Sequence, residues 1–112
     1  MEEQGVHAGY FCGLGVLSPI EVAYYSLRDK EYHAKSYEGE FEVLNTTENV
    51  SLVDGKPFIH MHITLCHTEF NSFGGHVIEG TVGPTLEMFL EAFEETIMRK
   101  LDSEIGLKLM DI

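Results

Sequence analysis

The chain has 112 residues, 44% hydrophobic and 11% aromatic, and this composition predicts one globular domain spanning residues 1–112. Nineteen Asp and Glu residues outnumber seven Lys and Arg residues, for a formal net charge of −12, which disfavours binding to phosphate backbones or anionic membranes. Two cysteines are too few for a disulfide framework. No secretion signal is evident, and no apolar stretch reaches the roughly 20 residues that span a bilayer. We therefore expect a cytoplasmic protein.

The first half of the chain predicts a series of short strands. Residues 10–17 are apolar but include Gly13 and Gly15, and glycine inside a strand often marks a bulge or a close approach by another backbone. Stretches rich in strand-forming residues follow at 22–27, 32–37, 40–44 and 50–53. The polar segments 28–31 and 45–49 are expected to interrupt them as a turn and a break.

The second half contains the clearest strand pattern, over residues 58–66, after a turn signal at 54–57. One face of this strand carries Phe58, His60, His62, Thr64 and Cys66. A loop is expected at 68–75 and another strand at 76–82.

The segment after Pro84 is ambiguous. The spacing of its apolar residues from Leu86 to Leu101 is typical of a helix, although part of it also fits strand alternation. A last short strand is expected within 107–112. These elements together predict a mainly antiparallel domain that is either α+β or all-β.

Three histidines lie on two neighbouring predicted strands: His60 and His62 on the first, and His76 at the start of the next. Residues two apart on a strand share one face at about 6.6 Å, so both imidazoles can approach one ion. His76 supplies a third ligand if the two strands pair as a hairpin, and Gly74 and Gly75 would let the backbones pass closely. Three neutral imidazoles with an open fourth position favour zinc. The alternative is a set of hydrogen-bonded sheet histidines that bind no metal.

Other groups are candidates for an accessory role at this site. Glu79 and Glu87 could act as a general base toward a metal-bound water. Cys66 shares the strand face of His60, whereas alternation predicts that His67 points away from it. No nucleophile elbow, phosphate-binding loop or dinucleotide fingerprint occurs in the sequence.

The order of several motifs resembles the PPC (plants and prokaryotes conserved) domain, whose prokaryotic members are often labelled PD1-like DNA-binding proteins. In chain order these motifs are Gly13-Leu-Gly15, Glu40–Leu44, Gly55–Phe58, His60–Leu65, Gly74-Gly-His76 and Gly80–Val82, closing on Glu87. The resemblance extends from about residue 9 to about residue 109.

This resemblance implies an α+β domain in which one or two helices flank a central, mainly antiparallel sheet. It also implies a homotrimer, zinc bound by His60, His62 and His76, and a strand rather than a helix around Leu86–Phe93. Relative to the family pattern, the first strand and most of the first helix are expected to be missing, with residues 1–9 as the end of that helix. In plants the domain accompanies AT-hooks, which contact DNA, while the domain itself mediates protein association.

Three functions follow, in order of preference. The first is a zinc-binding homotrimeric module for interaction or regulation, whose partners are its own copies and other proteins. The second is a small metal-dependent hydrolase or lyase, because three histidine ligands leave a position for a water whose pKa zinc lowers toward 7. The third is direct DNA binding, which the net charge of −12 and the absence of an AT-hook disfavour. We favour a non-enzymatic role, and no motif names a substrate.

Overall fold

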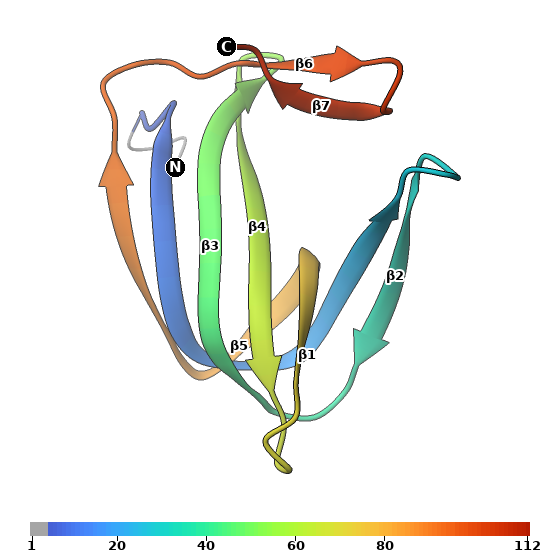
Figure 1. Ribbon diagram of the computed structural model, residues 1–112. Helices are drawn as coiled ribbons and strands as arrows, with labels where there is room; N and C mark the ends of the chain where they lie inside the picture. The colour runs from blue at the N-terminus through green and yellow to red at the C-terminus, as the bar shows by residue number, and fades with distance from the viewer. Residues whose placement is uncertain (1–4) are drawn as a thin grey trace.

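A computed structural model describes residues 5–112, and within that range the chain forms strands and no helix (Figure 1). The strands are β1 (Gly9–Ser26), β2 (Glu31–Tyr37), β3 (Phe41–Val53), β4 (Lys56–Cys66), β5 (Ser72–Ala92), β6 (Arg99–Asp102) and β7 (Leu107–Met110). The predicted α+β class with flanking helices is therefore wrong, and the described domain is all-β. Of the expected helix end, residues 1–4 lie outside the described range and residues 5–8 are a turn and irregular backbone.

The five larger strands form one antiparallel sheet, in the order β2-β1-β3-β4-β5, and the sheet closes on itself because β5 also pairs with β1. Strands β1 and β5 both bend sharply near their middles (Figure 1). The first part of β1 therefore pairs with β3 and its last part with β2. No helix that could cross a membrane occurs in residues 5–112, and the cytoplasmic location stays a prediction.

The short strands β6 and β7 form a separate hairpin that lies across the ends of β3 and β4 (Figure 1). A backbone bridge between Leu52 and Met98 joins the approach to this hairpin to β3. The Tyr25 hydroxyl at the end of β1 donates a hydrogen bond to the Ile105 carbonyl in the hairpin turn, at 2.6 Å. The hairpin is thereby held above one face of the sheet.

Residues 86–92 are the end of β5, although their spacing is typical of a helix. They pair with residues 9–15 of β1, so the strand implied by the family resemblance is confirmed as far as Ala92. Leu86 and Met88 pack against the core, whereas Phe89 is exposed on the other face. The helical spacing was misleading because the partner strand, from a distant part of the sequence, decides the backbone conformation.

Strand β3 runs without a break through residues 45–49, where the sequence predicted an interruption. These residues pair with β4 on one side and largely with β1 on the other, so their backbone groups have partners. Asn45 lies at a bulge, and Thr46 and Glu48 point inward and are buried. The Thr46 hydroxyl donates a hydrogen bond to Glu48 Oε2 at 3.0 Å, while the buried Glu48 Oε1 has no hydrogen-bond partner among the described residues.

The main core lies where the bent strands β1 and β5 cross β3 and β4. Its buried members are Leu17, Ile20, Val22, Phe41, Val43, Ile63 and Leu65. Phe73 of β5 packs against this cluster, and its ring lies 4.5 Å from Tyr37 and 5.5 Å from Phe41 between centroids. This packing fixes the start of β5 against β4. The same placement determines where the histidines of the two strands lie.

Replacing Leu65 by alanine should destabilise the domain strongly, because its side chain is 0% exposed in the main core. A buried leucine truncated to alanine lowers the free energy of unfolding by about 2–5 kcal/mol. The matched control is Leu44→Ala, at a side chain that is 52% exposed, for which we expect less than about 0.5 kcal/mol. Urea unfolding of both variants measures the difference, and equal losses would contradict this core.

Candidate metal centre

Three histidines meet on one face of the closed sheet. His60 and His62 lie on β4, and His76 of β5 is paired directly with His62. The predicted hairpin between these strands is confirmed, although the pairing covers only Ser72–His76 of β5. Residues 72–75 belong to β5, so the predicted loop over 68–75 is wrong for these four residues.

The glycines before His76 allow β5 to pass between two neighbouring strands. A Cβ atom on Gly74 would collide with the Ile63 backbone of β4, and one on Gly75 would lie 2.8 Å from the Ala23 carbonyl oxygen of β1. The predicted close passage of backbones at this glycine pair is therefore present. His76 follows immediately and is paired with His62 on one side and Ala23 on the other.

The three imidazole rings are close enough to share one ion. Ring centroids are 4.8 Å apart for His60 and His62, 5.2 Å for His60 and His76, and 5.6 Å for His62 and His76. One ring nitrogen from each residue lies within 4.8 Å of the other two, and the Nε2 atoms of His60 and His62 are 3.1 Å apart. Ligand nitrogens on a tetrahedral zinc ion are about 3.4 Å apart, from bonds of about 2.0–2.1 Å. Small movements of these side chains would therefore bring the three ring nitrogens to the spacing of zinc ligands.

The surroundings favour the neutral, metal-binding form of these rings. Burial, and then the charges of His62, His76 and Arg99, lower the pKa of His60 from 6.5 to about 4. Burial, and then His62, also lower the pKa of His76. The buried Nδ1 of His76 has no hydrogen-bond partner among the described residues. Because zinc binds neutral imidazole, the donor set and its protonation state fit this ion.

Two of the histidines, His60 and His76, line a pocket of about 290 Å³ between the sheet and the β6–β7 hairpin. Its walls are Tyr32, Phe58, His60, His76, Arg99, Gly106, Leu107, Lys108 and Leu109. The ring of Tyr32 stacks on His76, with centroids 4.6 Å apart and planes at 24°. Sequence reasoning missed Tyr32 and Arg99 as site residues, because both come from distant strands and belong to no motif.

Two accessory candidates lie at the far end of β4. Cys66 is buried there, and its thiol donates a hydrogen bond to the His67 carbonyl at 3.4 Å. The His67 ring lies 6.2 Å from the ring of Phe73. Neither contributes a ligand atom to the three-histidine cluster.

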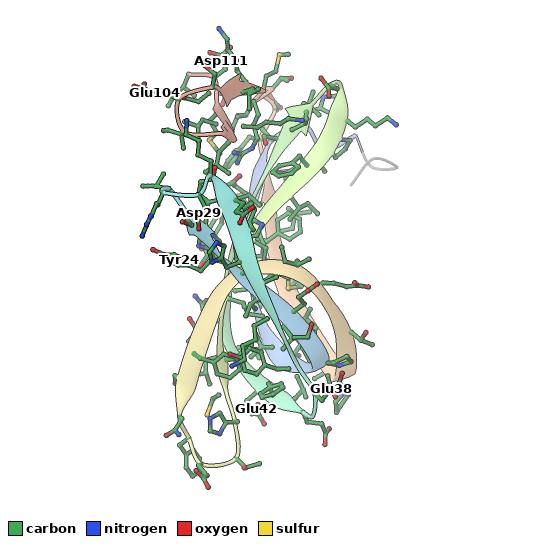
Figure 2. All side chains as sticks on the ribbon, turned by 90° about the vertical axis from the view of Figure 1, so that its right-hand side faces the viewer. Tyr24, Asp29, Glu38, Glu42, Glu104 and Asp111 are labelled. Atoms are coloured by element: carbon green, nitrogen blue, oxygen red, sulfur yellow. The ribbon has the colours of Figure 1, made fainter. Side chains whose placement is uncertain are left out.

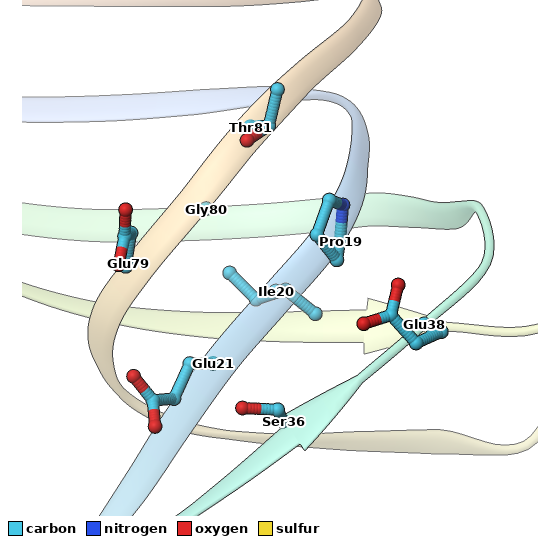
Figure 3. Close-up of a pocket in the computed structure, with 8 residues that line it drawn as sticks. All are labelled: Pro19, Ile20, Glu21, Ser36, Glu38, Glu79, Gly80 and Thr81. Atoms are coloured by element: carbon cyan, nitrogen blue, oxygen red, sulfur yellow. The ribbon is translucent and has the colours of Figure 1, made fainter.

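The two acidic accessory candidates lie on other parts of β5. Glu87 is exposed and paired with Leu14 of β1. Glu79 borders a different pocket, of about 220 Å³, together with Glu21 and Glu38 (Figure 3). Neither carboxylate belongs to the three-histidine cluster. The role of general base suggested for Glu79 and Glu87 therefore gains no support from their positions.

A second cluster of potential ligands occurs at the turn between β1 and β2. His33 Nε2 lies 3.0 Å from an Asp29 carboxylate oxygen and 3.7 Å from one of Glu31. All three side chains are exposed, and exposed ion pairs of this kind contribute little. His33 and His7 are both exposed.

The sequence matches the model of the Plants and Prokaryotes Conserved (PCC) domain over residues 1–94. The chain belongs to this family. This is the PPC family that the sequence motifs resemble, so the predicted membership is confirmed. No curated protein matches the chain.

Several solved structures are similar to this PPC domain over nearly its whole length. A PPC protein from Pyrococcus horikoshii is 36% identical, with a TM-score of 0.92 over 99% of this chain and 77% of the other. A metal-containing protein from Archaeoglobus fulgidus is 32% identical, with a TM-score of 0.91 over 99% and 79%. A candidate DNA-binding protein from Bacteroides thetaiotaomicron has a TM-score of 0.95 over 98% and 77%, but at 24% identity it shows the fold alone.

Acidification should destabilise the metal-free domain as the pH falls from about 6.5 to about 4. In this window the unfolded chain protonates His60 while the folded chain does not, since the folded pKa is about 4. The contribution of neutral His60 to the stability of the folded domain is therefore complete above pH 6.5 and is lost as the pH falls through this window. Urea midpoints at about pH 7 and about pH 5 measure the effect. His60→Gln should weaken the dependence and His7→Gln, at an exposed position, should not; identical profiles for all three proteins would contradict it.

Proposed function

We propose that this PPC domain binds one zinc ion through His60, His62 and His76 and acts as a non-enzymatic module for interaction or regulation. The observation that carries the proposal is the convergence of three ring nitrogens within 4.8 Å of one another. A relative from Archaeoglobus fulgidus, 32% identical, is a metal-containing protein. Zinc is chosen because three imidazoles form a favoured donor set for it. When bound, the ion would supply a Lewis-acidic position for one further ligand.

Protein purified without a histidine tag should contain about one zinc ion per chain. His60→Ala and His76→Ala should each lose most of this zinc, because either change leaves only two ligands. His67→Ala is the matched control and should retain it, since His67 lies outside the cluster. Elemental analysis of the purified proteins measures the content. Native protein that is metal-free and takes up no added zinc would overturn the proposal.

The same site suits a second candidate function, a small metal-dependent hydrolase or lyase. The favouring observation is the pocket of about 290 Å³ that is lined by His60 and His76 and could admit a substrate. Hydrolysis of small esters or lactones tests this function. Turnover that persists in His62→Ala would remove the mechanism.

We also propose that the domain assembles as a homotrimer, the stoichiometry of the family. Exposed apolar side chains on the outer face of β1 and β5 support self-association: Tyr10, Leu14 and Phe89 are 44%, 49% and 73% exposed, with Glu87 and Glu91 beside them on the same face. Strand pairing places the three apolar side chains on the same side of the sheet. Among the described strands, residues 86–92 pair only with β1, so their outer edge has unpaired backbone groups that another copy could cover.

Light scattering at micromolar concentration should give the mass of three chains. Phe89→Glu should shift the mass toward that of one chain, because a charge would be buried in the apolar contact. Phe70→Glu is the matched control, since Phe70 is 86% exposed in the loop between β4 and β5, away from these apolar side chains. A wild-type protein that is monomeric under these conditions would exclude the trimer.

Direct DNA binding is the third candidate, and the charge distribution opposes it. Acidic side chains occur at widely separated points of the molecule, as Asp29, Glu38, Glu42, Glu104 and Asp111 show (Figure 2). The formal net charge is −12, and the phosphate backbone would be repelled from such a surface. The candidate DNA-binding relative shares the fold at 24% identity, which does not extend its activity to this chain.

A further inference from the structure

Arg99, the first residue of β6, is a half-buried cation beside the histidine cluster. Within residues 5–112 the ion pairs all involve His33, so Arg99 has no carboxylate partner there. The chain has 19 acidic residues, and a charge that is partly removed from water is stabilised by a counter-charge. Burial lowers the pKa of Arg99, yet a guanidinium stays protonated at neutral pH. A positive charge therefore remains here without a counter-charge.

Neutral groups hold the Arg99 guanidinium in one orientation. Its Nε donates to the Ser51 hydroxyl at 2.7 Å, its Nη2 to the Asn49 side-chain oxygen at 2.8 Å, and its Nη1 to the Lys108 carbonyl at 2.8 Å. It also lies over the ring of Phe58, 5.2 Å from the centroid. A guanidinium has five N–H groups, so these bonds leave donors for another partner. The arginine is fixed in place but not neutralised.

Arg99 lines the same pocket as His60 and His76. Arg99 and His60 line one pocket, and, after burial, His62 and His76, the charge of Arg99 also lowers the pKa of His60. Most of the other side chains in the wall are large and apolar or aromatic, from Tyr32, Phe58, Leu107 and Leu109. A volume of about 290 Å³ is close to the lower end of the range for small-molecule sites. The pocket therefore combines one fixed cation with an apolar interior of limited size.

We propose that this pocket binds a small organic carboxylate, with its carboxylate group on Arg99 and its apolar body against Phe58, Tyr32 and Leu109. A carboxylate matches the paired N–H geometry of a guanidinium and brings one negative charge to the unpaired cation. The inference rests on the proposed function in one respect, since zinc on the histidines would add positive charge to the same pocket. Neutral molecules of the same shape would leave Arg99 without a counter-charge.

Calorimetric titration of benzoate into zinc-loaded protein tests the proposal, with benzyl alcohol as the neutral analogue. Benzoate should bind at least roughly tenfold more tightly than benzyl alcohol, the usual effect of one charge-assisted hydrogen-bonded pair. Arg99→Gln should weaken benzoate binding by roughly the same factor. Arg28→Gln is the matched control, because it removes the same charge from an exposed turn and should leave the affinity unchanged.

Arg99 also joins β6 to β3, so its replacement could displace the hairpin. The comparison of benzoate with benzyl alcohol is therefore also made in metal-free wild-type protein, where no zinc can coordinate the carboxylate, so that a preference for benzoate there decides the proposal. Equal affinities, or no benzoate binding at millimolar concentration, would overturn it and leave Arg99 as a structural link. Zinc content is measured on every sample. Benzoate binding that depends on Arg99 in protein that takes up no added zinc would support the carboxylate pocket while the proposed metal site fails.

Discussion

The passage of β5 between β4 and β1 is the constraint on which the rest of the structure depends. Gly74 and Gly75 have no side chains that would separate the three backbones, so the sheet can close at this point. Closure determines which residue of β5 stands opposite His62, and that residue is His76. The core around Leu65 and Phe73 holds the same register from the other side of the sheet. The histidine cluster is thus a product of sheet closure, and its rigidity comes from packing around it.

A second consequence of closure is an electrostatic contrast between the site and the rest of the surface. The chain carries a formal charge of −12, but Arg99 and three imidazoles gather under the β6–β7 hairpin. Burial keeps His60 and His76 neutral by lowering their pKa values, which prevents mutual repulsion among the rings. The histidine cluster is thereby suited to a cation, and the neighbouring Arg99 to an anion. The negative exterior would discourage large polyanions from approaching either.

The parts of the structure that were predictable from sequence depend on short-range patterns. The alternation in residues 58–66 and the two-residue spacing of His60 and His62 describe β4 correctly. The glycine pair indicates the close passage of backbones just before His76. The sequence pattern left α+β and all-β open, and the flanking helices implied by the family resemblance are absent from residues 5–112. Residues 86–92 follow helical spacing, and only their pairing with distant residues 9–15 makes them a strand. The polar run in β3 was missed for the same reason, since Thr46 and Glu48 are buried by partners on both sides. Arg99 reaches the site through the placement of the hairpin, which no local motif encodes.

The hairpin that carries Arg99 follows the segment matched by the family model, although similar solved structures cover 99% of this chain and so include it. The family match ends at residue 94, whereas β6 and β7 lie between Arg99 and Met110. The three histidines belong to the closed sheet, while one wall of the pocket and its fixed cation belong to the hairpin. Ligand selectivity is therefore separable from the proposed metal binding. Exchange of the hairpin sequence alone could give the same three-histidine scaffold a different choice of small molecule.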